Sequence, residues 1–281
     1  MDFLTWGHSP WGERILTHTS WDLLWASLFA GLIFLIAHAG YVVLSAHRKR
    51  AAAETDAMEA ERKDLPERVR RHSLAARLFH WVMAAAMFAL LFTAFLPIVG
   101  VQFPWVTWHW VAGLVLTGSI LFHVIHASFW LDFWSIWVGP KDIPEFKAEM
   151  LRELGHEVPG PKPGKYPLGN RLYHFVIVVA ALAAVGTGLF MMIRVRTPFL
   201  PRNPYLFGDA AWGLVYVSHG LAGVALVGLV MAHVYFAVRP DKWWITKSMI
   251  FGWITRRQYL EHHDPERWAV GPEGARPADR R

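Results

Sequence analysis

Five apolar runs, each long enough to cross a lipid bilayer as a helix, constrain the fold of this 281-residue chain more than any other feature. The backbone polar groups of a spanning segment must be satisfied inside the membrane, so each run is expected to be helical. The sequence therefore predicts an all-α membrane protein with five transmembrane helices. The runs extend over Trp21 to Ala46, Leu74 to Leu96, Trp108 to Trp130, Asn170 to Ile193 and Trp212 to Val238.

Lys and Arg are distributed unequally between the two sides of these helices. The side with the carboxyl terminus holds 24 of the 28 basic residues, and the opposite side holds 4. Basic residues favour the cytoplasmic side, so we expect a multi-pass protein of the bacterial inner membrane, with a periplasmic amino terminus and a cytoplasmic carboxyl terminus. The net charge of +6 thus fits orientation in membrane lipid, and no nucleic-acid partner is expected.

The fifth run carries two histidines, His219 and His233, fourteen residues apart. Fourteen residues make about 3.9 helical turns, so both side chains leave one face, roughly 21 Å apart along the axis. The small residues between them leave room for a flat cofactor or for a closely packed neighbour. Histidines are costly inside a membrane and are usually functional, so the pair predicts two stacked cofactors, with haem as the working hypothesis.

Other histidines lie at matching levels. His109 begins the third run at the outer level, and His80 lies at the inner end of the second run. The levels pair His109 with His219 on an outer haem, and His80 with His233 on an inner haem. His123, fourteen residues after His109, could replace His80. Two imidazole ligands favour electron transfer over oxygen chemistry.

Further polar side chains have open roles. Arg77, one turn before the histidine of the second run, is a candidate for binding a haem propionate or for simple snorkelling to the interface. His123 and His126 form a His-x-x-His pair that could bind a metal or lie at the interface.

The chain has no cysteine, which excludes thiolate-held iron–sulfur clusters and the covalent attachment of c-type haem.

Several segments resemble the gamma subunit of membrane-bound formate dehydrogenase. This subunit belongs to a wider family of di-haem cytochrome b subunits that also serves hydrogenases and thiosulfate or polysulfide reductases. The matching segments are RLFHW (Arg77 to Trp81), His109, KYPLGNRLYHF (Lys165 to Phe175), SHGLAGVALVGLVMAHVY (Ser218 to Tyr235) and WITRRQYLEHHDPERW (Trp253 to Trp268).

The resemblance implies the same histidine pairing and a quinone site beside the inner haem. In the matching stretch, Gly169 and Asn170 stand near the start of the fourth run. Pro167 occupies a position where the family carries a polar side chain, which leaves Asn170 as the main polar candidate. His174, on the same side, is a candidate for quinone contact, proton delivery or interfacial anchoring.

The resemblance also implies cofactors and partners. Two b-type haems and a quinone, ubiquinone or menaquinone, are expected as cofactors. An iron–sulfur subunit and a catalytic dehydrogenase or reductase subunit are expected on the outer face. Quinone reduction is then the chemistry expected in this chain. The first run is extra relative to the family's four-helix pattern, which leaves the partner and its docking open.

The expected organisation has three parts. Residues 1–72 comprise an amino-terminal tail, the extra helix and a charged segment from Ala51 to Arg71 that is expected to form a surface helix. Residues 73–240 form the four-helix di-haem domain. Residues 241–281 comprise an amphipathic interfacial helix from Asp241 to Tyr259, in front of His262 and His263, and a disordered tail from Gly271. The two histidines suggest either a metal site or a docking or folding element.

Other classes of function remain open. A self-contained membrane cytochrome without a dehydrogenase partner fits the same histidines, and co-purification with an iron–sulfur subunit distinguishes the two. A His-ligated di-iron oxidase is disfavoured because the histidines occupy two membrane depths. A metal transporter is disfavoured because the chain lacks inverted repeats and has few acidic residues in its spans.

Overall fold

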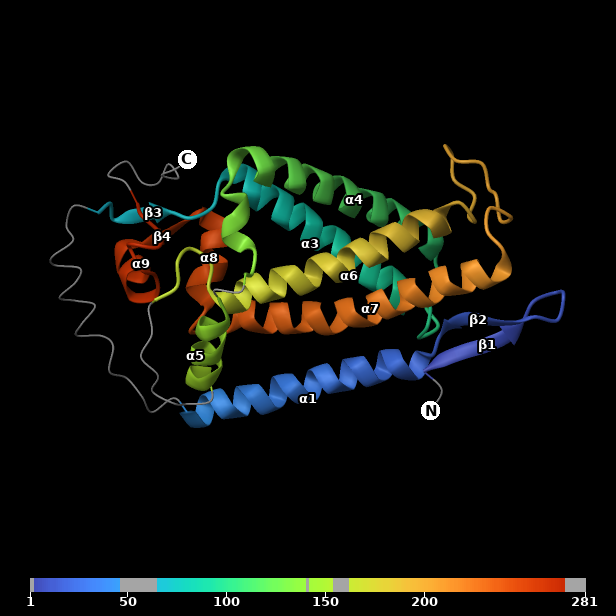
Figure 1. Ribbon diagram of the computed structural model, residues 1–281, viewed down its shortest axis with the longest axis horizontal. Helices are drawn as coiled ribbons and strands as arrows, with labels where there is room; N and C mark the ends of the chain where they lie inside the picture. The colour runs from blue at the N-terminus through green and yellow to red at the C-terminus, as the bar shows by residue number, and fades with distance from the viewer. Residues whose placement is uncertain (1–2, 46–64, 140–141, 154–161, 271–281) are drawn as a thin grey trace. The chain divides into compact units, whose positions relative to one another are not determined.

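The computed structural model describes residues 3–45, 65–139, 142–153 and 162–270. Within these ranges, five helices are long and apolar enough to cross a membrane, which confirms the predicted number (Figure 1). Their bounds differ from the predicted bounds by at most three residues. The helices are α1 (Trp21–Ser45), α3 (Leu74–Phe95), α4 (Trp105–Trp130), α6 (Leu168–Met192) and α7 (Asp209–Val238).

Prolines lie at several ends of these helices. Pro97 follows the end of α3, and Pro240 follows the end of α7. Pro104 and Pro167 directly precede the first residues of α4 and α6. Proline cannot donate a backbone hydrogen bond, so it is tolerated at a helix start and stops a helix that approaches it.

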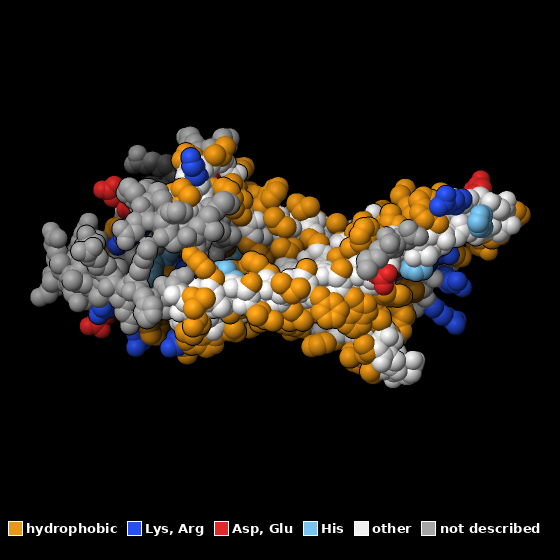
Figure 2. Space-filling view, turned by 90° about the horizontal axis from the view of Figure 1, so that it is seen from below, with side chains coloured by type: hydrophobic (Ala, Val, Ile, Leu, Met, Phe, Trp, Pro, Cys, Tyr) orange, Lys and Arg blue, Asp and Glu red, His pale blue; other side chains and the backbone are white. Residues whose placement is uncertain are grey.

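The surface of the long helices is apolar, as a lipid environment requires. In α1 none of the spanning window is buried by the protein, and Ile36 and Leu44 are 72% and 79% exposed. Figure 2 shows a helical surface made mainly of hydrophobic side chains. Exposed apolar area of this extent is unusual for a water-soluble protein and is expected for helices that contact lipid tails.

The chain forms two compact units. Unit 1 comprises Met1–Ile36, Trp81–Leu121 and Val176–His233. Unit 2 comprises Ala37–His80, Phe122–Phe175 and Val234–Arg281. Each unit therefore contains segments that lie far apart in the sequence, and each is described by itself below.

Unit 1 contains a β-hairpin in the region predicted as a polar tail. β1 (Leu4–His8) pairs antiparallel with β2 (Arg14–Thr19), and Gly12 lies in the turn with a φ of +87°. A positive φ is easily adopted only by glycine, so this residue permits the turn. The tail prediction missed the hairpin because its alternation of apolar and polar residues is short and irregular.

Small residues of α7 allow close packing in unit 1. Thr19 Oγ1 donates a hydrogen bond to the Val217 carbonyl at 3.2 Å, and Ser27 Oγ donates to the Val224 carbonyl at 3.0 Å. A Cβ added at Gly220 would overlap Thr19. Within unit 1, α1 thus packs against α7, and part of the small-residue face of α7 holds a protein neighbour.

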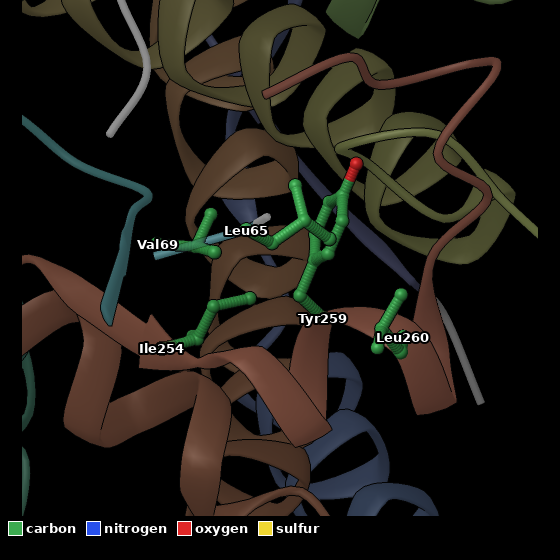
Figure 3. Packing of buried hydrophobic residues seen from close by; sticks show 5 residues of the cluster. All are labelled: Leu65, Val69, Ile254, Tyr259 and Leu260. Atoms are coloured by element: carbon green, nitrogen blue, oxygen red, sulfur yellow. The ribbon is translucent and has the colours of Figure 1, made fainter. Parts of the chain in front are cut away.

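Unit 2 is held by a small hydrophobic core. β3 (Arg68–Arg70) pairs antiparallel with β4 (Trp253–Thr255), with Val69 opposite Ile254. The core residues come from both strands, from the segment just before β3 and from the helix that follows β4, and Figure 3 labels them. They are Leu65, Val69, Ile254, Tyr259 and Leu260.

The predicted helix from Asp241 to Tyr259 is wrong in its continuity. The structure has α8 (Trp243–Phe251), then β4, then α9 (Arg256–His262). Gly252 ends α8 with a φ of +89°, and a capping box of Thr255 and Gln258 starts α9. Local capping signals and the pairing with β3 outweigh the helical periodicity of this segment.

The connections complete the described chain. Between α4 and α6 lie the short 3₁₀ helix η1 (Phe133–Ile136) and α5 (Ile143–Glu153). Most of the charged segment from Ala51 to Arg71 lies outside the described residues, and its described end is strand β3 instead of the predicted helix. The predicted disordered tail from Gly271 also lies outside the described residues.

Candidate haem site

Unit 1 brings together two of the predicted haem ligands. His109 of α4 and His219 of α7 have ring centroids 6.2 Å apart, with 74° between the ring planes. Metal–imidazole bonds are about 2 Å long, so two imidazoles on opposite sides of one ion have centroids roughly 6 Å apart. The separation of the two rings therefore fits ligation of a single iron.

Both rings are held through the same nitrogen. His109 Nδ1 lies 2.8 Å from Thr93 Oγ1, and His219 Nδ1 lies 3.0 Å from Thr187 Oγ1. His219 Nδ1 also lies 3.1 Å from the Ala184 carbonyl oxygen, which can only accept, so Nδ1 carries the proton. Nε2 is left with its lone pair, which is the form of histidine that binds a metal.

The surroundings of this pair are small and apolar. A Cβ at Gly188 would lie 3.2 Å from His219 Cε1, so the ring fits because α6 has a glycine there. An open groove of about 510 Å³ between α3 and α4 reaches Thr93. The sequence analysis did not select Thr93, Thr187 or Gly188, because a single threonine or glycine in an apolar helix is an ordinary occurrence.

The two histidines predicted for the inner haem belong to different units. His80 lies in α3 at the end of a unit 2 segment, and its side chain is half-buried. His233 lies in α7 at the end of a unit 1 segment, and its side chain is exposed. The pairing of these two residues stays a prediction.

Unit 2 brings together His123 and His174. Their ring centroids are 6.3 Å apart, at 73° between planes. Phe79 lies against His123 with centroids at 4.4 Å, and Trp137 lies edge-on to His174 at 5.5 Å. Among the described residues, Nδ1 of both histidines is buried without a hydrogen-bond partner, unlike Nδ1 of His109 and His219. His126 is also buried, with its Nδ1 unpartnered in the same ranges.

The predicted quinone-site residues lie at the start of α6. Gly169 and Asn170 are exposed in its first turn. The neighbouring Arg171 forms an ion pair with Asp142 at 2.6 Å and also donates to the Trp137 carbonyl. The Arg171 hydrogen bond lowers the pKa of the Asp142 carboxyl group. This link fixes the preceding connection to α6 and so holds Trp137 beside the fourth spanning helix.

Arg77 is bound by the backbone of α8. Its Nη1 donates to the Ile250 carbonyl at 2.5 Å. A Cβ at Gly252 would lie 3.2 Å from Arg77 Nε, so the glycine leaves space for the guanidinium. The proposed contact of Arg77 with a haem propionate stays a prediction.

His263 takes part in a buried polar contact in unit 2. Arg71 Nη1 donates to His263 Nε2 at 2.8 Å, and His263 Nδ1 donates to the Gly164 carbonyl at 2.7 Å. Burial lowers the pKa of Arg71 to about 10, and burial together with Arg71 lowers that of His263 to about 3. His263 is therefore neutral and acts as a folding element. In the described ranges no group of three or more His, Asp or Glu residues is arranged to hold a metal ion.

Comparison with known proteins places the chain in a family. The model of the family "Prokaryotic cytochrome b561" matches residues 71–252, which is more than half of the chain. The cytochrome b556 subunit of formate dehydrogenase from Haemophilus influenzae is 24% identical over 217 residues, covering 72% of this chain and 82% of the relative. The cytochrome b556(fdo) subunit from Escherichia coli K12 is 23% identical over 212 residues, covering 70% and 90%. The predicted resemblance to such subunits is confirmed, and the chain belongs to the prokaryotic cytochrome b561 family.

Proposed function

We propose that this chain is the membrane-anchoring di-haem cytochrome b subunit of a respiratory oxidoreductase complex. It carries electrons between an iron–sulfur subunit on the periplasmic side and a quinone site on the cytoplasmic side. Membership of a cytochrome b family implies haem b as the cofactor. The names of the relatives support formate dehydrogenase as the kind of complex.

The observation that carries the proposal is the His109–His219 pair. The two rings have the separation that one iron requires, and Nδ1 of each ring is hydrogen-bonded, so that Nε2 can bind the metal. His109 and His219 would hold the iron as two imidazole ligands, a ligand set that favours electron transfer over oxygen chemistry. A histidine that only packs between helices needs neither a second imidazole facing it nor a proton on the same ring nitrogen as that second imidazole.

The second haem is assigned to His80 and His233, with Arg77 as the candidate for a propionate. The fourteen-residue spacing of His219 and His233 supports this assignment, because it repeats one ligand at a second level of α7. The di-haem domain then corresponds to residues 73–240, with residues 1–72 and 241–281 as flanking parts.

The quinone site is assigned to the start of α6, at Gly169 and Asn170. His174 lies one turn further along α6, beside His123. Two imidazoles with unpartnered Nδ1 atoms can accept and pass protons, so His174 and His123 are suited to deliver protons to a reduced quinone. The quinone is ubiquinone or menaquinone.

The sidedness of the two sites gives the chain its bioenergetic role. When bound, haem b supplies reversible one-electron transfer. The apolar helices exclude water between the two ligand levels, and the basic residues hold the quinone side in the cytoplasm. Moving one charge against the membrane potential involves about 2.3 kcal/mol per 100 mV. Oxidation outside with proton uptake inside therefore conserves energy as membrane potential.

Pyridine haemochrome quantification with a reduced-minus-oxidised visible spectrum tests the proposal. We expect two b-type haems per chain in the purified protein and one in the His219→Ala variant. Absence of haem, with bound iron or zinc instead, contradicts the proposal in favour of a di-iron oxidase or a transporter. Two haems in His219→Ala contradict the ligand assignment alone.

Co-purification tests the partner. A mild detergent extract of cells carrying a tagged chain is expected to yield an iron–sulfur subunit and a catalytic subunit together with the cytochrome. A haem-loaded chain that is recovered without either subunit, and that is still reduced by quinol, indicates a self-contained cytochrome.

A further inference from the structure

Two threonines on different helices contact the histidine pair of unit 1 in the same way. Thr93 Oγ1 on α3 donates to the Ala89 carbonyl at 2.7 Å, and Thr187 Oγ1 on α6 donates to the Ala183 carbonyl at 2.5 Å. A hydroxyl has one proton, and each is used within its own helix. Each hydroxyl oxygen therefore accepts the Nδ1–H of the facing imidazole.

A second acceptor completes the contact of His219. The Ala184 carbonyl, three residues before Thr187, also lies 3.1 Å from His219 Nδ1 and accepts from it. The Nδ1–H of His219 thus lies between a threonine hydroxyl and a backbone carbonyl of one helical turn, and that of His109 faces the Thr93 hydroxyl. Acceptors at fixed positions determine which nitrogen carries the proton and limit rotation of the ring.

We propose that Thr93 and Thr187 are positioning residues that set the reduction potential of the haem held by His109 and His219. This inference rests on the proposed function, since it assumes that the pair binds haem iron. The threonines bind Nδ1 of both rings, which leaves Nε2 as the nitrogen for the metal, and they fix rings whose planes lie at 74° to each other.

The direction of the effect follows from the basicity of the ligands. A hydrogen bond from Nδ1–H raises the basicity of an iron-bound imidazole, and a more basic ligand favours the ferric state. The two threonines therefore lower the potential of this haem. The nearly perpendicular imidazole planes also predict a strongly anisotropic low-spin EPR signal from the ferric form.

Isosteric variants of the full chain test the proposal. Thr93→Val and Thr187→Val keep the side-chain volume and remove the hydroxyl, whereas Thr93→Ser and Thr187→Ser keep the hydroxyl. Thr117→Val in α4 is the matched control, because the Thr117 hydroxyl makes the same bond to a carbonyl of its own helix, Gly113, at 2.7 Å. The measurements are a potentiometric titration, the EPR spectrum and the haem content of the purified protein.

We expect each Val variant to raise the potential of one of the two haems, to reduce the anisotropy of its EPR signal and to weaken its retention roughly 10-fold. The double Val variant is expected to show a larger shift of the potential, while both Ser variants and Thr117→Val behave like the wild type.

Unchanged potentials and EPR signals in fully haem-loaded Val variants overturn the inference. Ser variants that behave like Val variants assign the effect to packing and overturn it as well. A wild-type chain without haem overturns the proposed function itself.

Discussion

The absence of a side chain at Gly188 leaves the space in which the ring of His219 lies. A Cβ at Gly188 of α6 would approach His219 Cε1 to 3.2 Å, closer than ordinary van der Waals contact. The space beside Gly186, two residues earlier on the same helix, is open. At the residue scale, then, the candidate haem site depends on small side chains next to the ligands as well as on the ligands.

Gly188→Ala is expected to displace the His219 imidazole and to lower the haem content by up to one haem per chain. The cause is the close approach of the new methyl group, at 3.2 Å from His219 Cε1, to a ring whose Nδ1 is already held by Thr187 and Ala184. Gly186→Ala is the control and should keep both haems. Equal haem content in the two variants, measured as pyridine haemochrome, contradicts the role given to Gly188.

The competition between His80 and His123 for the second haem is also decided at single residues. We expect His80→Ala to remove one haem and His123→Ala to leave both, because His123 already lies against His174 and Phe79 in unit 2. Haem content and the number of EPR signals distinguish the variants. The reverse result assigns the ligand role to His123.

At the scale of elements, α7 serves two neighbours. Its glycines approach β2 and α1 in unit 1, and two of its histidines are predicted ligands of haem iron. Close packing at the glycines gives the extra helix α1 a docking surface on α7. The amino-terminal hairpin is therefore part of the packed protein and not a free tail.

Gly213→Ala is expected to loosen the β1–β2 hairpin, because a Cβ there overlaps the Leu16 carbonyl of β2. Overpacking of this kind costs about 1–3 kcal/mol, so hydrogen exchange of the hairpin amides should rise by roughly 10-fold or more. Gly223→Ala is the control, because a Cβ added there meets no atom within 4 Å. Unchanged exchange in Gly213→Ala shows that the hairpin does not depend on this contact.

The contact between Arg71 and His263 predicts a pH dependence of stability. The pKa of His263 is lowered to about 3 in the folded protein, against about 6.5 in an unfolded chain. Between these values the unfolded chain binds a proton that the folded chain does not bind. The free energy of unfolding therefore falls as the pH falls below 6.5, by about 1.4 kcal/mol per pH unit, and levels off near pH 3. His72, whose pKa burial lowers to about 2, contributes with the same sign.

His263→Gln removes the titrating group and keeps one donor and one acceptor. Its unfolding is expected to depend less steeply on pH between 6.5 and 4 than that of the wild type. Thermal unfolding in detergent, followed by tryptophan fluorescence, measures the difference, because Trp244 and Trp268 lie beside His263. Identical pH profiles for the two proteins contradict the neutral state assigned to His263.

At the scale of the whole molecule, the distribution of basic and apolar residues predicts the orientation of the chain in the membrane. The apolar helices have the length to span a bilayer, and the basic residues are concentrated on one side of the predicted topology. The iron–sulfur partner and the quinone are therefore expected at opposite membrane faces, as the proposed energy conservation requires.

Reporter fusions test the predicted orientation of the chain in the membrane. A periplasm-dependent reporter such as alkaline phosphatase is expected to be active in the connection between α6 and α7 and inactive after residue 270. The expectation follows from the excess of Lys and Arg on the side of the carboxyl terminus. The opposite activity pattern reverses the topology and places the His109–His219 pair near the cytoplasm.

The sequence by itself determined the five helices, because apolar length in a membrane leaves helix as the structure that satisfies the backbone. It also determined the family resemblance, through segments such as RLFHW that keep residue type and spacing. It selected His109 and His219 as partners, and the structure brings their rings to 6.2 Å. Their roles as iron ligands, like those of His80 and His233, stay predictions.

Only the tertiary structure decided which small and polar residues surround these histidines. Thr93 and Thr187 come from two other helices, and Gly188 is one of several glycines in the spans, so no local pattern marks them. The break after α8 and the contact between Arg71 and His263 likewise depend on pairing between distant segments. Periodicity and composition are properties of neighbouring residues, whereas ring orientation, tautomer and close approach are set by side chains that meet only when the helices pack.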